Sequence, residues 1–314
     1  MNYDWSGSAG VFLTRDVLAD GYDDKTIARM VRSGYWHRIR RGAFVLGDTW
    51  RDMDDVGRHR LRARAVLRTA HPTAVLSHVS AVLEHGAPVW GAPLDDVHLT
   101  RSDGKSGRRE AGVAHHRGLL AGHGIQPAHE LPVTAPARAL MELTTMTSVE
   151  SSLVSTNALL NSGTVSRQDL ESALAVMQHW PESLRSDVVV RLADSRCAWP
   201  GEARMSHLIW REHLPKPEPQ FEIYDERGNL VAVLDFAWPT FGAFGEFDGR
   251  IKYDRLRRPG ESLEDVILRE KRRQELVTLL TGWVCIRVSW EDLERPVTTA
   301  RRIRSVLLDR PVPA

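Results

Sequence analysis

The sequence has few cysteines and no long apolar run. Only Cys197 and Cys285 occur among its 314 residues, and no Cys-x-x-Cys or Cys/His spacing accompanies them. This excludes a disulfide framework and a cysteine-ligated zinc site, and it predicts two buried, reduced thiols. No apolar stretch approaches the roughly 20 residues that a membrane-spanning helix needs. The N-terminus has neither the basic start nor the apolar segment of a signal peptide, so we expect a cytoplasmic protein.

A strong excess of charge of one sign is also absent, since the formal net charge is +1. The overall charge therefore neither indicates nor excludes a polyanionic partner. The positive charge is concentrated between residues 36 and 69, which hold nine arginines and four acidic residues. Arginine is favoured where phosphate oxygens are gripped in a fork, although a GC-rich genome also raises arginine content. This segment thus favours nucleic-acid binding without establishing it.

The chain is long enough for two or three domains, because single hydrophobic cores rarely grow beyond about 250 residues. We predict a multidomain α/β protein with three parts. They are an N-terminal winged helix over residues 1–60, a mixed α/β middle domain over residues 61–195 and a C-terminal α/β domain over residues 196–314.

The N-terminal part has the signals of two helices and a hairpin. Helices over residues 14–20 and 25–33 are predicted by a glycine after each one and by two aspartates before the second. Residues 35–46 alternate in polarity and turn at Arg41-Gly42, which is typical of a β-hairpin. Helix, helix and hairpin in this order predict a winged helix.

The second helix has one apolar face and one basic face. Ile27, Met30 and Val31 recur at helical spacing and are expected to be buried. In a winged helix the second helix enters the major groove, and the hairpin touches the backbone or the minor groove. We therefore predict binding of duplex DNA through Lys25, Arg29, Arg32, Arg38, Arg40 and Arg41. Small units of this kind also serve as protein-docking modules, and this alternative stays open.

The middle part mixes helices and short strands. We expect helices over residues 56–69 and 73–83, strands near 97–99 and 113–116, and further helices beginning near residues 135, 148, 166 and 183. It also contains His78, His85, His98, His115, His116, His123 and His129. No two of them have His-x-x-x-His spacing on a predicted helix with a carboxylate partner, and His115 and His116 point to opposite faces of a strand. We therefore predict no metal site in this region.

Several segments of the first 180 residues match a known family. They are Val11–Thr14, Ile27–Gly34, Trp36 with Arg40–Phe44, Ala74–Ala81, His116–Gly118 and Leu131–Leu140. In this order they resemble the AbiEi-type antitoxins of type IV toxin–antitoxin systems. The resemblance implies a cytoplasmic transcriptional autoregulator, often paired with a nucleotidyltransferase-type toxin.

Two carboxylates in the C-terminal part are expected to lie close together. Strands are predicted over residues 230–236 and 241–247, and they end with Asp235 and Glu246. Carboxylates at one end of neighbouring strands can hold Mg²⁺ or Mn²⁺, a hard cation that polarises a phosphodiester and lowers the pKa of a bound water. An aspartate at a strand end is also a common turn former, so the pattern alone does not decide between the two.

The segments after residue 200 also match a known group. They are Pro200–Glu202, Gln220, Val233–Pro239, Gly245–Gly249, Arg269–Arg273 and Gly282–Val288. As a set they are similar to PD-(D/E)XK nucleases of the very-short-patch-repair-like group, which implies a restriction-endonuclease-like α/β fold. The implied catalytic residues are Glu202, Gln220, Asp235, Glu246, Asp248 and Lys252, of which Asp235, Glu246 and Glu202 are the candidate metal ligands.

The set departs from the nuclease pattern at one position. Asp248 stands two residues after Glu246, where the motif normally has lysine, although very-short-patch-repair-like enzymes also depart from it. We expect the chain to turn after Gly249 and to bring the Lys252 amine within about 6 Å of the Asp235 and Glu246 carboxylates. The alternative is an ordinary surface lysine.

Two functions follow from these observations, and both can hold at once. The first is a Mg²⁺-dependent endodeoxyribonuclease directed to DNA by the winged helix, for example in phage defence. The second is an autoregulatory repressor or antitoxin in which the nuclease fold is catalytically silent and serves as a docking surface. The basic helix over residues 263–281 either faces DNA or is a solvated face beside core positions 266, 267, 276, 277 and 280.

Overall fold

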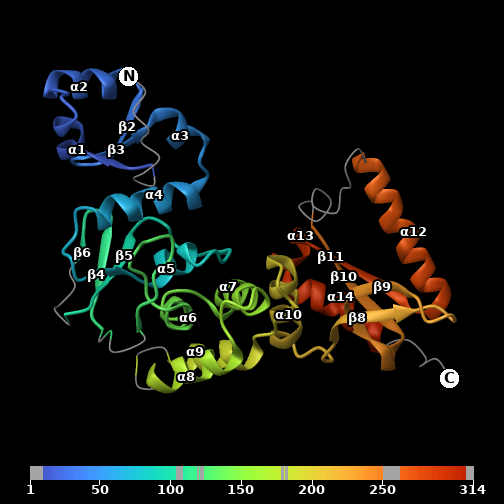
Figure 1. The fold of residues 1–314 in the computed structure, drawn as a ribbon. Coiled ribbons are helices and arrows are strands. Elements are labelled where there is room, and N and C mark those ends of the chain that lie inside the picture. Colours follow the sequence, from blue (N-terminus) through green and yellow to red (C-terminus); the bar gives the residue numbers. More distant parts are fainter. Residues whose placement is uncertain are drawn as a thin grey trace. The chain divides into compact units, whose positions relative to one another are not determined.

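The computed structural model describes residues 10–103, 109–118, 120, 124–177, 180, 183–249 and 262–308. The chain divides into two compact units, one comprising Met1–Ser148 and Gly163–Val190 and the other Val149–Ser162 and Arg191–Ala314. Both units combine helices with sheets, as expected for a multidomain α/β protein (Figure 1). The division into three domains at residues 60 and 195 stays a prediction.

The first unit begins with two helices and a three-stranded sheet. The elements are β1 (Phe12–Leu13), α1 (Thr14–Ala19), α2 (Asp24–Arg32), β2 (Trp36–Arg40) and β3 (Ala43–Leu46), with strand order β1-β3-β2. The Asp23 side chain accepts a hydrogen bond of 2.8 Å from the Thr26 amide and so caps α2. Gly42 supplies the left-handed turn residue, with φ 76°. The predicted helices and hairpin are present.

An aromatic cluster holds these elements together. Phe12, Trp36 and Phe44 are buried, and the ring centroids of Phe12 and Trp36 lie 5.0 Å apart in an edge-on arrangement. Ile27 of α2 packs into this cluster, and Met30 packs against it. Ile27 is therefore buried as predicted, whereas Met30 and Val31 are only partly buried, and the basic face of α2 is left toward solvent.

Two further helices connect this sheet to the next one. They are α3 (Gly47–Asp52) and α4 (Asp55–Leu67). Arg60 of α4 donates two hydrogen bonds, of 3.1 and 3.0 Å, to the buried carboxylate of Glu84, and Arg64 lies 3.8 Å from the same group. A buried carboxylate is stable only with such partners, so these arginines have a structural role.

The second sheet of the first unit has the strand order β4-β5-β7-β6. Strand β5 pairs antiparallel with β4 and parallel with β7. The strands are β4 (Ala74–Leu76), β5 (Val97–Arg101), β6 (Arg109–Glu110) and β7 (Val113–His116), and the helices are α5 (His78–Glu84), α6 (Pro136–Thr144), α8 (Arg167–Met177) and α9 (Ser183–Leu192).

The helix predicted over residues 73–83 is wrong in its first part. Ala74–Leu76 is a buried strand, and the helix begins only at His78. A short apolar run fits a buried strand as well as a helix, and pairing with β5 decides between them here. This difference changes where His78 lies, because it now follows the end of a strand.

The second unit has a four-stranded sheet with helices on both faces (Figure 1). Met205 and Ile303, from α10 and α14, share one core with Phe236 and Phe247, whereas Val277 of α12 shares another with Phe244. The strand order is β11-β10-β9-β8. The elements are α7 (Val149–Asn161), α10 (Pro200–Arg211), β8 (Glu218–Tyr224), β9 (Leu230–Trp238), β10 (Ala243–Asp248), α12 (Leu263–Thr281), β11 (Val284–Ser289), α13 (Trp290–Leu293) and α14 (Pro296–Leu308).

Two details of this unit correct the sequence predictions. Strand β10 begins at Ala243, because a 3-10 turn at Pro239–Phe241 precedes it, and it continues to Asp248. In α12, Val277 is fully buried as expected, but Leu276 and Leu280 are 43% and 40% exposed. The sheet thus buries fewer of the apolar residues of α12 than we expected from the sequence.

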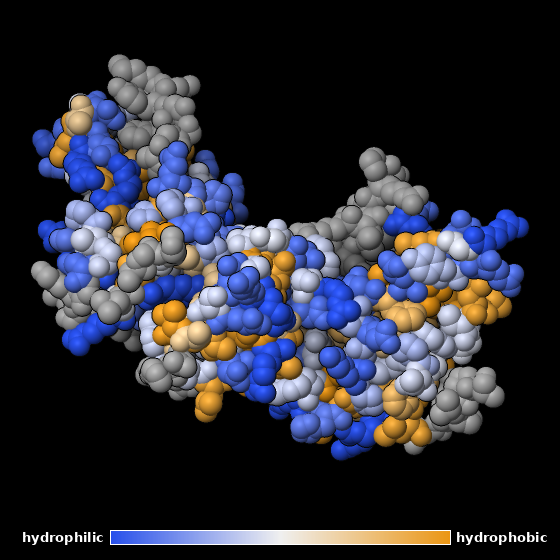
Figure 2. Space-filling view, turned by 60° about the horizontal axis from the view of Figure 1, so that its bottom comes forward, coloured by the Kyte–Doolittle hydropathy of each residue, from blue (hydrophilic) through white to orange (hydrophobic). Residues whose placement is uncertain are grey.

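The surface and the thiols are those of an ordinary globular chain. None of the described helices is long and apolar enough to cross a membrane. Hydrophilic residues cover most of the face shown in Figure 2, with hydrophobic residues in separate patches between them. Both cysteines are free. Cys197 is buried as expected, whereas Cys285 is only partly buried, and burial raises their pKa to about 12 and about 11, respectively.

Candidate functional site

Three of the six predicted catalytic residues lie in one row across the sheet of the second unit. Gln220 of β8 and Asp235 of β9 lie between the paired residues Pro219–Phe236 and Phe221–Leu234, so they stand across from one another on adjacent strands. Glu246 of β10 comes one step past the last paired residues, Gly245 and Phe236, and so lies beside Asp235 as well. The fold thus brings an amide and two carboxylates onto three adjacent strands. Strand β8, which positions Gln220, was not predicted from the sequence.

The middle of this row has an irregular backbone. Asp235 is 5% exposed, and its Oδ2 accepts a hydrogen bond of 2.9 Å from the Phe247 amide, where the ladder between β9 and β10 ends. Gln220 has φ 54°, a left-handed conformation that costs a non-glycine residue on the order of 1 kcal/mol. Strain of this kind is commonly retained where it positions functional side chains.

Arginines neutralise both carboxylates of β10, Glu246 and Asp248. Glu246 Oε2 lies 3.3 Å from Nη2 of Arg273 in α12, and Asp248 Oδ2 lies 3.4 Å from Nη1 of Arg287 in β11. Side chains alternate along a strand, so Glu246 and Asp248 share the face of Phe244, which packs toward α12. The charge of Arg273 in α12 is therefore paired with a carboxylate of the protein itself.

The remaining two predicted residues are placed differently. Glu202 is buried in the first turn of α10, next to Gly201, which packs against the Phe247 ring on the opposite face of β10 from Glu246. Lys252 lies outside the described residues. Its predicted approach to the carboxylates therefore stays a prediction.

The six residues predicted to bind DNA lie on α2 and the β2–β3 hairpin, and we call them the basic surface. Arg40 is partly buried and the others are exposed. In the described part of the chain, none of the six forms a salt bridge with a carboxylate. The Arg38 guanidinium instead lies 5.7 Å from the centroid of the Phe44 ring, an arrangement that leaves its charge available.

The other arginines between residues 36 and 69 have partners within the protein. Arg51 pairs with Asp48, Arg58 with Asp55, Arg60 and Arg64 with Glu84, and Arg68 with Asp16, while Arg62 donates to the carbonyls of Leu94 and Asp95. Among the described residues, Arg38, Arg40 and Arg41 of this stretch thus differ from its other arginines, because they have neither a carboxylate partner nor the carbonyl partners of Arg62.

The segment that contains the basic surface matches a known protein family. A family model described as a transcriptional regulator, AbiEi antitoxin, matches residues 6–47. Residues 6–47 are therefore similar to AbiEi-type regulators, and we call this segment the AbiEi-type domain. All six residues of the basic surface lie within the AbiEi-type domain, and the internally paired arginines of α3 and α4 lie outside it.

Similarity to whole proteins extends beyond the AbiEi-type domain. Two uncharacterized proteins of Mycobacterium tuberculosis, from strains CDC 1551 / Oshkosh and ATCC 25618 / H37Rv, are each 28% identical to this chain over 233 residues. The aligned part covers 72% of this chain and 80% of each relative. The similarity therefore includes a large region that follows the AbiEi-type domain.

One group of residues outside the AbiEi-type domain was not expected from the sequence. His78, His98 and His116 of the first unit each offer a ligand atom, and these atoms all lie within 4.8 Å of one another. The three positions are 20 and 18 residues apart, so no motif spacing identifies them. The lack of a motif spacing therefore does not exclude a metal site in this region.

Proposed function

We propose that this chain is a transcriptional regulator that binds duplex DNA through its AbiEi-type domain. The observation that supports this most directly is the basic surface, which combines exposure, positive charge and the absence of salt bridges in the described structure. In this proposal the chain represses its own operon and, like the antitoxins it resembles, acts together with a nucleotidyltransferase-type toxin.

The arrangement of the basic surface indicates how DNA is held. Lys25, Arg29 and Arg32 follow one another at helical spacing on the face of α2 opposite Ile27. When α2 lies in the major groove, these side chains reach phosphates and base edges. The arginines at the turn of the hairpin then reach the adjacent backbone.

Replacing Arg40 and Arg41 by alanine is expected to weaken the dependence of DNA binding on salt. Each neutralised phosphate contributes a slope of about −0.9 to the plot of log affinity against log salt, so the double variant loses about one to two units of slope. Fluorescence anisotropy with a labelled duplex measures this. The matched control, Arg227→Ala with Arg301→Ala, removes the same charge from exposed sites of the second unit. An unchanged slope in the Arg40/Arg41 variant removes the hairpin from the interface.

A second function, phosphodiester hydrolysis in the second unit, is favoured by the row of Gln220, Asp235 and Glu246. The donor set fits a hard divalent cation, because two carboxylates lie side by side on adjacent strands. Asp235 and Glu246 would hold Mg²⁺ or Mn²⁺, and the cation would polarise the scissile phosphate. Glu202, the third ligand expected from the sequence, follows Gly201, which packs on the opposite face of β10 from Glu246, so it does not join this pair.

The protein's own groups would position the substrate and the attacking water in this reaction. The Gln220 amide, whose backbone is strained, would hold a phosphate oxygen or orient Asp235. Asp248 adds a carboxylate on the face of Glu246, and Lys252 remains the candidate source of positive charge beside the water. Arg273 already balances Glu246, so the cation has to share this carboxylate with the guanidinium.

Asp235→Asn and Glu246→Gln are each expected to abolish metal-dependent cleavage while DNA binding by the AbiEi-type domain persists. Each change keeps the shape of the side chain and removes the charge that holds the cation, so cleavage should fall by about 100-fold or more. The measurement is conversion of supercoiled plasmid with Mg²⁺ or Mn²⁺, with Glu226→Gln as an exposed control. If the unmodified protein cleaves neither duplex, single-stranded nor mismatched DNA, the second unit is catalytically silent.

A further inference from the structure

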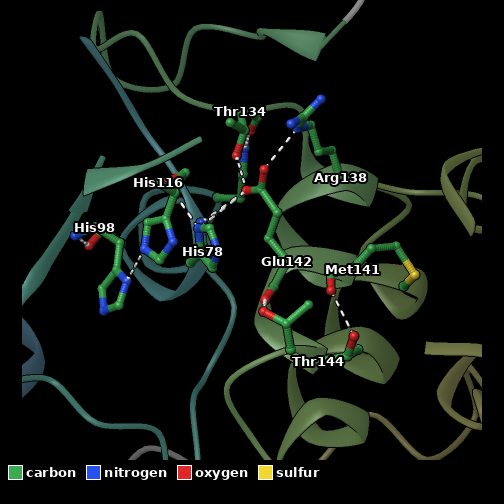
Figure 3. A network of polar contacts seen from close by, with 12 residues as sticks. His78, His98, His116, Thr134, Arg138, Met141, Glu142 and Thr144 are labelled. Atoms are coloured by element: carbon green, nitrogen blue, oxygen red, sulfur yellow. Dashed lines mark hydrogen bonds and ion pairs between the residues drawn. The ribbon is translucent and has the colours of Figure 1, made fainter. Parts of the chain in front are cut away.

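The first unit contains a cluster of three histidines that the proposed function does not use. The centroids of the His78 and His116 rings lie 3.6 Å apart, and those of His98 and His116 lie 5.1 Å apart. His98 Nδ1 lies 2.8 Å from His116 Nε2. Figure 3 shows the three rings side by side, with Glu142 next to His78.

Neighbouring elements of the sheet create this cluster. His98 and Thr100 stand on the same face of β5, and Thr100 pairs in register with His116 on the parallel strand β7. His78 comes directly after β4, the other neighbour of β5, at the first residue of α5. Two adjacent strands and the start of the helix that follows a third strand thus each supply one imidazole to the same place.

We propose that His78, His98 and His116 bind a divalent transition-metal ion, Zn²⁺, with water completing a tetrahedral site. Around Zn²⁺, with Zn–N bonds of about 2.0–2.1 Å, three ligand nitrogens lie about 3.3 Å apart. Ligand atoms within 4.8 Å of one another reach this arrangement by small side-chain rotations. Three nitrogen donors favour Zn²⁺ over Mg²⁺ or Ca²⁺, which take oxygen ligands.

A buried carboxylate fixes the position of His78. Glu142 Oε2 accepts a hydrogen bond of 3.1 Å from the His78 amide and lies 3.8 Å from its Nδ1 (Figure 3). Arg138 Nε donates to the other oxygen at 2.8 Å, which balances the charge. These bonds hold His78 at φ 53°, a conformation that a non-glycine residue rarely adopts. The ring is oriented separately, since His78 Nδ1 lies at hydrogen-bond distance, 3.0 Å, from the Ser77 hydroxyl, which leaves Nε2 as the candidate ligand atom.

One more polar group lies beside the cluster. Thr100 is 1% exposed, and its hydroxyl has no hydrogen-bond partner among the described residues. Its side chain shares the sheet face of His98 and His116. Buried hydroxyls are normally satisfied, so a polar ligand on this face, such as a metal-bound water, would remove an unfavourable feature. Through these contacts Zn²⁺ would join β5, β7 and the start of α5.

The test is metal analysis of the full chain after chelation and addition of Zn²⁺, followed by titration with Co²⁺ as a spectroscopic probe. We expect one bound Zn²⁺ per chain, the visible absorption of tetrahedral Co²⁺, and a rise of roughly 5 °C in the melting temperature of the metal-loaded protein. His98→Ala and His116→Ala should each weaken binding by about 100-fold or more.

Two controls assign the bound ion to this cluster. His129→Ala changes an exposed histidine of the same unit, and Glu246→Gln changes a candidate ligand of the second unit, so both should keep the bound equivalent. The unmodified chain provides a result that does not depend on how the variants fold. Failure of that chain to retain one equivalent of Zn²⁺, or equal binding by the His98 and His116 variants, overturns the proposal.

Discussion

Replacing Gly47 by alanine is expected to unfold the AbiEi-type domain and to abolish DNA binding. A Cβ atom at position 47 would lie 1.9 Å from the backbone carbonyl oxygen of Gly34, and a backbone atom cannot move aside as a flexible side chain can. The Gly47 amide also donates a hydrogen bond of 2.8 Å to the Tyr35 carbonyl, which fixes the close approach of the two segments. Overpacking of this severity costs about 3 kcal/mol or more, a large part of the stability of a small domain.

Thermal unfolding by circular dichroism, together with DNA binding, measures this effect. Gly21→Ala is the matched control, because Gly21 lies in the same domain with open space around it. An alanine there is strained only by the positive φ of 87°. That change should cost about 1 kcal/mol. Similar melting temperatures for the two variants would show that the segments around residues 34 and 47 are not packed as described.

Replacing Gly201 by alanine is expected to destabilise the second unit by about 3 kcal/mol. The new Cβ would lie 2.0 Å from Cε1 of Phe247, and this ring is held from another side by Trp290, whose centroid lies 4.9 Å away. The strain would fall on β10, the strand that contains Glu246. Any nuclease activity should therefore be lost together with stability.

A double-mutant cycle tests whether Phe247 is the cause. Adding Phe247→Leu to Gly201→Ala should recover part of the lost stability, because the two residues are in direct contact and their effects are not additive. Gly228→Ala serves as the control, since this glycine of the second unit has open space around it and a φ of 78°. Additive effects of the two changes would contradict the packing of α10 on β10.

The local signals in the sequence were sufficient for the N-terminal elements. The turn at Arg41-Gly42 and the aspartates before α2 act within a few residues, so hairpin and helix could be predicted from them. Which arginines stay available for DNA could not be predicted in this way. Arg60 and Arg64, for example, pair with Glu84, which approaches them only after the chain has folded.

Both candidate sites depend on pairing between separate strands, and this pairing could not be predicted from local patterns. Asp235 and Glu246 were expected to be neighbours because their strands follow each other, whereas Gln220 joined them only through the unpredicted strand β8. The histidine cluster depends on parallel pairing of β5 with β7 and on β4, a strand mistaken for a helix. Neither feature leaves a spacing pattern in the sequence.

The affinity of the full chain for a duplex at increasing salt measures DNA binding by the AbiEi-type domain directly. If the six residues of the basic surface each contact one phosphate, affinity falls by about 1,000-fold between 50 and 200 mM salt. A variant with Arg29, Arg32, Arg40 and Arg41 all changed to alanine should lose most of this dependence. Absence of duplex binding at 50 mM salt, or an unchanged slope in a variant that folds normally, would contradict the account.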